Sequence, residues 1–246
     1  MKGMLLAMPR RVALLLATIL VWPAFVLADA SAAEMDDQIF TFFQAEQLEY
    51  RFKDGKDSLN WDAQGWIGED YNKLWIKTEG EKVFGGALEE AEVQVLYSRL
   101  IHPFWDIQVG GRYDARPQPQ RGFGVIGLQG LAPYFFEVDA AGFVSHEGDV
   151  SARLKGEYEL LLTQKLILQP SAEFNLAAQQ VEKLGIGSGL TDVELGLRLR
   201  YEFVREFAPY VGVSWERKIG KTADFARDEG EDVDALSLVT GVRFWF

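Results

Sequence analysis

The sequence has 246 residues, no cysteine, and 37 acidic against 25 basic side chains, which give a net charge of −12. The lack of cysteine excludes disulfides and thiolate metal sites, and the acidic balance argues against nucleic acid and favours cations as partners. Outside the N-terminus there is no long apolar run, so the composition does not predict a helical membrane protein.

The N-terminus resembles an export signal. Residues 12–27 form an apolar run that follows three basic residues and precedes a stretch of small residues. This pattern predicts a signal peptide over residues 1–30, with cleavage as late as residue 32 as a second option, and an N-terminal membrane anchor as the alternative. Residues 31–37 are then a short periplasmic segment, and residues 38–246 form the folded domain. Without the signal peptide the net charge is about −14.

From residue 38 onward, apolar and polar residues alternate with a period of two. In the clearest segment, one phase is apolar from Val193 to Phe203, and the other carries charges from Asp192 to Glu202. A strand sends successive side chains to opposite faces, so this segment predicts a strand with one apolar and one charged face. A helix would spread the charges around its whole surface.

The same alternation occurs in twelve segments, separated by turn residues. They are residues 40–53, 58–67, 73–81, 89–99, 104–114, 121–131, 134–145, 150–163, 166–177, 191–204, 208–217 and 235–246. An even number of strands is typical of single-chain bacterial barrels. Residues 121–131 alternate least clearly, because both phases of this segment contain apolar side chains.

The expected connections fit a barrel topology. The long ones, residues 82–89, 114–121, 177–191 and 217–234, are all odd-numbered, although the odd-numbered turn at 54–57 is short. In outer-membrane barrels the extracellular connections are the longer ones. The sequence therefore predicts an all-β fold, a transmembrane antiparallel barrel of 12 strands with both termini periplasmic.

The charged phases are expected to face the lumen, because a Lys or Arg facing lipid at the midplane costs roughly 2–4 kcal/mol. The apolar phases then contact outer-membrane lipid. The expected lumenal charges are Glu46, Asp62, Lys77, Glu79, Glu92, Asp106, Arg112, Glu137, Asp139, Arg153, Lys155, Glu157, Glu159, Glu173, Glu194, Arg198, Arg200 and Glu202. They either brace the barrel by pairing or guide a hydrated cation along a narrow water path.

Aromatic residues gather near the expected strand ends, where amphipathic rings favour the headgroup level of a membrane. The expected girdle residues are Trp66, Tyr71, Trp75, Tyr97, Trp105, Tyr113, Tyr134, Phe135, Tyr210 and Trp215. The last strand alternates up to Phe246, and such an ending resembles the sorting signal of outer-membrane proteins. Together with the signal peptide, it predicts the outer membrane of a Gram-negative cell.

Four stretches carry a resemblance to a known family: Asp70–Glu81, Gly130–Val138, Glu159–Pro170 and Glu202–Val213. They resemble characteristic stretches of the copper resistance protein B family, in the same order, and the resemblance extends from about residue 38 to the end. It implies an outer-membrane barrel that acts in copper tolerance by binding or exporting copper, with a periplasmic copper-binding protein as a partner. Copper is then a transported or transient ligand and not a fixed cofactor.

One departure from the family concerns soft metal ligands. Members commonly carry a long Met- and His-rich segment before the barrel, whereas only Ser31–Asp37 occupies that place here. Copper(I) prefers sulfur ligands and copper(II) imidazole, so the candidate metal ligands are Met35, His102 and His146. The two histidines are expected in connections on opposite sides of the membrane. The alternative to a copper contact is that each is a solvated loop histidine without a ligand.

Two other classes of function remain open. One is a general, mildly cation-selective porin without copper specificity. The other is a hydrolase built around Ser145-His146-Glu147, but neighbours in sequence do not make a catalytic triad. The expectation is a protein that is not an enzyme.

Overall fold

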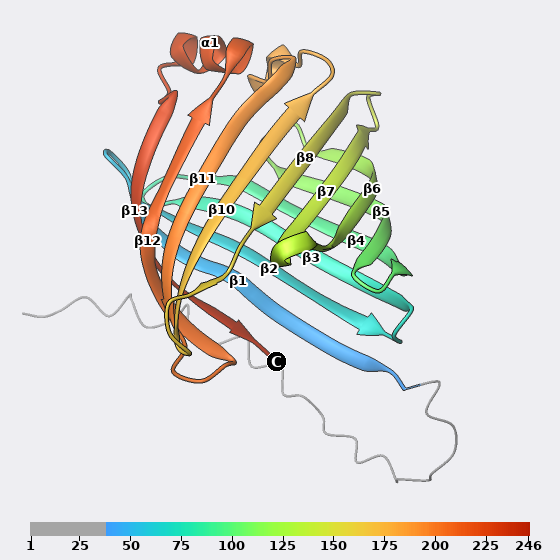
Figure 1. The fold of residues 1–246 in the computed structure, drawn as a ribbon. Helices are drawn as coiled ribbons and strands as arrows, with labels where there is room; N and C mark the ends of the chain where they lie inside the picture. The colour runs from blue at the N-terminus through green and yellow to red at the C-terminus, as the bar shows by residue number, and fades with distance from the viewer. Residues whose placement is uncertain (1–37) are drawn as a thin grey trace, which may run out of the picture. The chain divides into compact units, whose positions relative to one another are not determined.

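The computed structural model describes residues 38–246. The predicted signal peptide, the segment 31–37 and Met35 lie outside the described residues. The described part is one antiparallel sheet in which strands adjacent in the chain are adjacent in space. The sheet closes because its last strand, β13, pairs with its first, β1 (Figure 1). Closure leaves no free strand edge, which is what a membrane-spanning sheet requires.

The strand bounds agree closely with the twelve segments expected from the alternation. The strands are β1 Phe40–Phe52, β2 Ser58–Gly68, β3 Asn72–Val83, β4 Leu88–His102, β5 Trp105–Arg116, β6 Arg121–Ala132, β7 Phe136–Ser145, β8 Val150–Glu157, β9 Leu160–Leu161, β10 Leu166–Ala177, β11 Gly189–Tyr201, β12 Phe207–Lys218 and β13 Asp234–Trp245. Both β8 and β9 pair with β10, so they form one interrupted strand. The barrel therefore has twelve strands, as predicted.

The connections differ from the expectation at two places. The antiparallel order puts every odd-numbered connection at one end of the barrel, here called the loop end. Two of the four expected long connections there are short turns, residues 84–87 and 117–120, because β3, β4 and β5 continue pairing beyond the alternating pattern. Backbone hydrogen bonds hold a strand together whatever its side chains are. The expectation of four long loops was therefore wrong for these two.

Two long connections remain at the loop end. The one between β10 and β11 contains a short helix, η2 Glu182–Leu184, and the one between β12 and β13 contains α1, Gly220–Glu229, which lies beside the loop end (Figure 1). The Thr222 hydroxyl of α1 accepts a hydrogen bond of 2.9 Å from the Gly187 N–H of the other connection. The sequence did not predict α1, because its few apolar residues form no helical pattern. Within residues 38–246, no helix has the length and apolar character needed to cross a membrane.

The barrel is apolar outside and charged inside, as predicted. On β11, Leu195 and Leu197 are exposed on the outer face, whereas Arg198 and Arg200 are only 4% and 1% exposed. The weak alternation of β6 has a structural reason. Ile126 lies on the outer face, while Phe123 on the inner face belongs to an apolar cluster inside the barrel. This strand is apolar on both faces because both faces are buried, one by lipid and one by the cluster.

Some of the expected girdle aromatics lie inside the barrel instead. Tyr71, Tyr97, Tyr113, Tyr134 and Phe135 are exposed on the outside, in keeping with a girdle. Trp75 and Tyr210, however, are buried, and Trp66 packs against the internal apolar cluster. The girdle assignment was wrong for these three because it used proximity to strand ends and ignored phase: Trp75, for example, shares the inward phase of Lys77.

Candidate functional site

The candidate site is the barrel lumen, and its contacts show which side chains point into it. In a closed barrel, side chains from strands that are not neighbours can meet only across the interior. The Lys77 Nζ of β3 lies 2.6 Å from the Asp139 Oδ2 of β7. The Lys155 Nζ of β8 lies 3.3 Å from the Asp62 Oδ2 of β2. These four residues, all expected in the lumen, are therefore lumenal.

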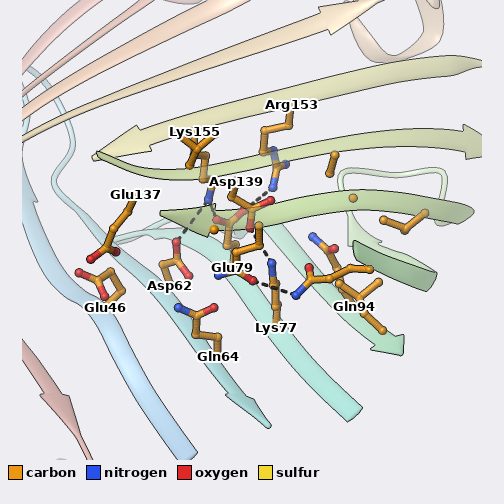
Figure 2. A pocket seen from close by; sticks show the side chains of 18 of the residues that line it. Glu46, Asp62, Gln64, Lys77, Glu79, Gln94, Glu137, Asp139, Arg153 and Lys155 are labelled. Atoms are coloured by element: carbon orange, nitrogen blue, oxygen red, sulfur yellow. Dashed lines mark hydrogen bonds and ion pairs between the residues drawn. The ribbon is translucent and has the colours of Figure 1, made fainter. Parts of the chain in front are cut away.

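Arg153 and Lys155 of β8 form the centre of the network (Figure 2). The Arg153 guanidinium contacts Glu79 on β3, and its Nη2 lies 3.0 Å from the Glu92 Oε2 on β4. Its Nε lies 3.4 Å from the Glu173 Oε1 on the neighbouring strand β10. One arginine thus ties together carboxylates from opposite walls. A guanidinium has five donors in a planar fork, which suits it to hold several carboxylates.

A second cluster, here called the arginine cluster, consists of Glu49 and Arg51 on β1 and Glu194 and Arg198 on β11. Glu49 is fully buried, and it accepts hydrogen bonds from the Arg51 Nε at 2.8 Å and from the Arg198 Nε at 2.7 Å. The Arg51 Nη2 also reaches the Glu194 Oε1 at 2.7 Å. The network therefore satisfies both oxygens of a carboxylate that is removed from water, as a buried charge requires.

A third group lies toward the end opposite the loop end. The Arg200 Nη2 contacts the Glu159 Oε1 at 2.6 Å, and the Arg243 Nη1 contacts the same oxygen at 3.0 Å. Arg243 also lies 3.0 Å from the Glu46 Oε1. The Gln169 side-chain amide donates hydrogen bonds to Glu46 and, at 2.5 Å, to the Glu157 Oε2. It therefore links the two carboxylates.

Asp106, Glu202 and Arg112, which were also expected in the lumen, pair with residues on the same part of the sheet or a nearby one. Asp106 lies 3.7 Å from the Lys73 Nζ, and Glu202 lies 3.6 Å from Arg200. Arg112 contacts the Glu92 Oε2 at 2.7 Å and the Asp114 carboxylate at 2.6 Å. Its guanidinium also lies over the Phe143 ring, 4.8 Å from the centroid. Such cation–π contacts connect the charged network to the internal apolar cluster.

A cavity of about 270 Å³ lies between the central network and the apolar cluster. Charged side chains from five strands, β1, β2, β3, β7 and β8, line it: the carboxylates Glu46, Asp62, Glu79, Glu137, Asp139 and Glu157, and the cations Lys77, Arg153 and Lys155. Within residues 38–246, neither Glu137 nor Glu157 makes an ion pair with a Lys, Arg or His side chain. Carboxylates outnumber cations two to one in the lining, so the formal charge of the lining residues is negative.

The two histidines do not contribute to this cavity. His102 is the last residue of β4, and His146 lies in the turn after β7, so the antiparallel order puts them at opposite ends of the barrel. Both are exposed. Across the described residues, no group of three or more His, Cys, Asp or Glu side chains is arranged to hold a metal ion.

Ser145 has a structural role in the turn between β7 and β8. It is 5% exposed, and its hydroxyl oxygen accepts hydrogen bonds from the backbone N–H groups of Glu147 at 3.2 Å and Asp149 at 3.0 Å. The His146 Nδ1 lies 3.4 Å from the backbone of Gly122. The Ser145 hydroxyl is therefore engaged by its own turn, in the way that serine commonly stabilises turns.

Several lumenal residues are not identifiable from the alternation, for a structural reason. Strand β1 has an irregularity in pairing between Ala45 and Leu48, so its inward phase changes. Glu46, within this bulge, points inward, and after the bulge Glu49 and Arg51 do. A bulge places two residues opposite one and leaves no clear sign in a period-two pattern. Arg243, by contrast, could have been found from the inward phase of β13.

Solved structures with a similar fold define the class of protein. The NanC porin aligns with a TM-score of 0.54 at 12% identity, over 83% of this chain and 99% of the porin. Outer membrane phospholipase A from Escherichia coli aligns with a TM-score of 0.50 at 12% identity, over 83% of this chain and 92% of the phospholipase. At such identities the likeness concerns the fold alone. The chain has the fold of an outer-membrane β-barrel.

Sequence comparison identifies the family. The family model described as "Copper resistance protein B precursor (CopB)" matches residues 39–246. Copper resistance protein B of Escherichia coli is 48% identical over 201 residues, which are 82% of this chain and 68% of that protein. The homolog from Pseudomonas syringae pv. tomato is 44% identical over 211 residues, 86% of this chain and 71% of its own length. The chain belongs to the copper resistance protein B family, as the four resembling stretches predicted. It acts in copper resistance at the outer membrane.

Proposed function

We propose that this barrel contributes to copper resistance by binding copper ions transiently in its lumen and allowing their export across the outer membrane, without catalysing a reaction. The cavity carries this proposal, because six carboxylates line it against three cationic side chains. Among divalent ions of the first transition row, copper(II) binds a given set of oxygen and nitrogen ligands most strongly. An acidic lumen in a copper resistance family is therefore suited to copper as cargo.

The same geometry favours this function over that of a general porin. Ion pairs such as Lys77–Asp139 and Lys155–Asp62 span the lumen between walls that are not neighbours. A general porin of larger strand number leaves an open aqueous channel. Side chains that cross the lumen restrict the path to ions that can exchange with charged groups, and this is a property of a selective passage.

The orientation and the accessory ligands are part of the proposal. Both termini lie in the periplasm, and the two long connections with α1 lie outside the cell, as is usual for such barrels. His102 is then at the periplasmic mouth and His146 at the external one. Each offers a single imidazole that contacts copper briefly, and a periplasmic copper-binding protein delivers the ion to the mouth that carries His102.

The test is copper tolerance in the source organism. Deleting the gene is expected to lower tolerance, and the wild-type gene to restore it. A barrel with Glu137→Gln and Glu157→Gln keeps its size and loses the two cavity carboxylates that lack ion pairs, so it is expected to restore tolerance only in part. Glu147→Gln, in an external turn, is the matched control and should restore it fully. Unchanged tolerance after deletion, or full rescue by the double variant at equal barrel levels, would contradict the proposal.

A further inference from the structure

The side chain of Lys155, on β8, lines the lumenal cavity. The Lys155 ammonium contacts the Glu79 carboxylate of β3 and lies 3.3 Å from the Asp62 Oδ2 of β2 and 3.5 Å from the Glu173 Oε2 of β10. Three carboxylates from three other strands thus surround one positive charge. Two of them, Asp62 and Glu79, also line the cavity, so this position borders the space that a mobile ion would use (Figure 2).

The other lumenal lysines are not held in this way. Lys77 has one carboxylate partner, Asp139 at 2.6 Å, and Lys73 has one, Asp106 at 3.7 Å. Arg153 does meet three carboxylates, but its guanidinium holds Glu92 through two nitrogens, at 3.1 and 3.0 Å. A planar group bound in this bidentate manner is fixed in place, whereas an ammonium on a flexible four-carbon stem can withdraw.

We infer that Lys155 is the specificity-determining residue of the lumen: a tethered cation that occupies the carboxylates of Asp62, Glu79 and Glu173 and that a passing ion must displace. This inference rests on the proposed function and names the residue that selects the ion. No covalent step is involved. The ammonium leaves the carboxylates when an ion binds them, and it returns when the ion departs.

Competition with a tethered group discriminates between ions by their affinity for carboxylates. A tethered ammonium has a high effective concentration at its partners, so weak ligands do not displace it. Potassium and sodium bind carboxylates weakly, whereas a divalent ion gains twice the charge interaction with each of them. Copper(II) also gains the most from coordination among the divalent ions of its row. Lys155 therefore excludes monovalent ions and admits copper(II).

The experiment measures ion passage through the whole refolded barrel in planar lipid bilayers. Conductance in potassium chloride and the permeability of copper(II) relative to potassium are compared for the wild type, Lys155→Met and Lys155→Arg. Lys165→Met, in an exposed turn outside the lumen, is the matched control for loss of one positive charge. Folding is checked for each protein by heat-modified migration in gels.

Lys155→Met is expected to raise potassium conductance about fivefold, the factor that one charge interaction at about 4 Å in water provides. The copper-to-potassium permeability ratio should fall by a similar factor. Lys155→Arg should keep a low potassium conductance, and Lys165→Met should match the wild type. If Lys155→Met leaves both quantities at wild-type values, or if Lys165→Met changes them as much, the inference is overturned.

Two further comparisons cover the cases in which Lys155→Met does not fold or copper does not pass. If Lys155→Met does not fold, the variant with Lys155→Met and Asp62→Asn restores the charge balance and should still conduct potassium better than Asp62→Asn alone; equal conductance would overturn the inference. If copper passes through neither wild type nor variant, the proposed function fails. Potassium conductance then decides whether Lys155 excludes monovalent ions: a rise in Lys155→Met supports this exclusion, and no change rejects it.

Discussion

Two walls of the same lumen are stabilised in different ways. On the wall made by β3, β4, β6 and β7, the apolar cluster of Trp75, Leu96, Phe123, Val125 and Phe143 is packed inside the barrel. On the wall made by β11 to β13 and β1, the arginine cluster buries Glu49 between two guanidinium groups. The cavity borders the apolar wall and the central network.

The two walls should differ in the substitutions that they tolerate. Apolar packing loses stability in proportion to the volume removed, and a smaller side chain can be partly accommodated by neighbours. A buried ion pair depends on both partners, because removing one leaves the other charged and without compensation. The apolar wall is thus tolerant of conservative change, and the charged wall is not.

The largest expected effect is on the charged wall. Glu49→Gln leaves Arg51 and Arg198 facing a neutral amide in a fully buried site, so we expect a loss of about 3–5 kcal/mol in the free energy of unfolding. Urea unfolding of the barrel in detergent micelles, followed by tryptophan fluorescence, measures it. Replacing Glu49 and Arg198 together with Leu and Met should cost less than Glu49→Gln alone. A double variant that is less stable than the single one would refute this view of the wall.

A smaller effect is expected on the apolar wall. Leu96 is 1% exposed within the cluster, and Leu96→Ala should reduce the free energy of unfolding by about 3 kcal/mol through lost burial and a new void. Leu96→Met keeps the volume, and the same urea experiment should give a change below about 1.5 kcal/mol. If the two substitutions cost the same, packing at this wall does not depend on volume.

The smallest effect is expected at the loop end, outside both walls. The Lys218 Nζ contacts the Glu231 Oε2 at 2.7 Å, but the Glu231 side chain is 56% exposed. Lys218→Met should therefore change the free energy of unfolding by less than about 1 kcal/mol. The difference from wild type should disappear in urea titrations at high salt, which screens exposed charges. A salt-independent loss above that value would show that this pair is structurally coupled to the barrel.

Much of the fold could be predicted from the sequence because membrane strands obey a local rule. Alternation along β11 identifies both the strand and the side that faces lipid, since Leu195 and Arg198 cannot exchange faces without a large cost. The rule failed where its assumption failed. On β6 both faces are buried, and on β1 a bulge moved Glu49 into the inward phase. Helix α1 lies outside any alternating segment, so the rule gives no information about it.

The candidate site was predictable only as a set of inward-facing charges. Their phase followed from alternation, but their partners did not. Lys155 and Asp62 are 93 residues apart in sequence, and nothing local indicates that they meet. Contacts of this kind depend on the tilt and stagger of twelve strands around a closed barrel, which are properties of the whole sheet.

By itself, the sequence determined an outer-membrane barrel of twelve strands, its lipid-facing phase and its family, because these depend on periodicity and on short matching stretches. Only the tertiary structure decided which charges pair across the lumen, that one wall inside the barrel is apolar, and that Lys155 lies among three carboxylates. The physical reason is that alternation determines only which face of the sheet a residue lies on. Closure of the sheet determines its position along the barrel axis and the residues that it meets on that face.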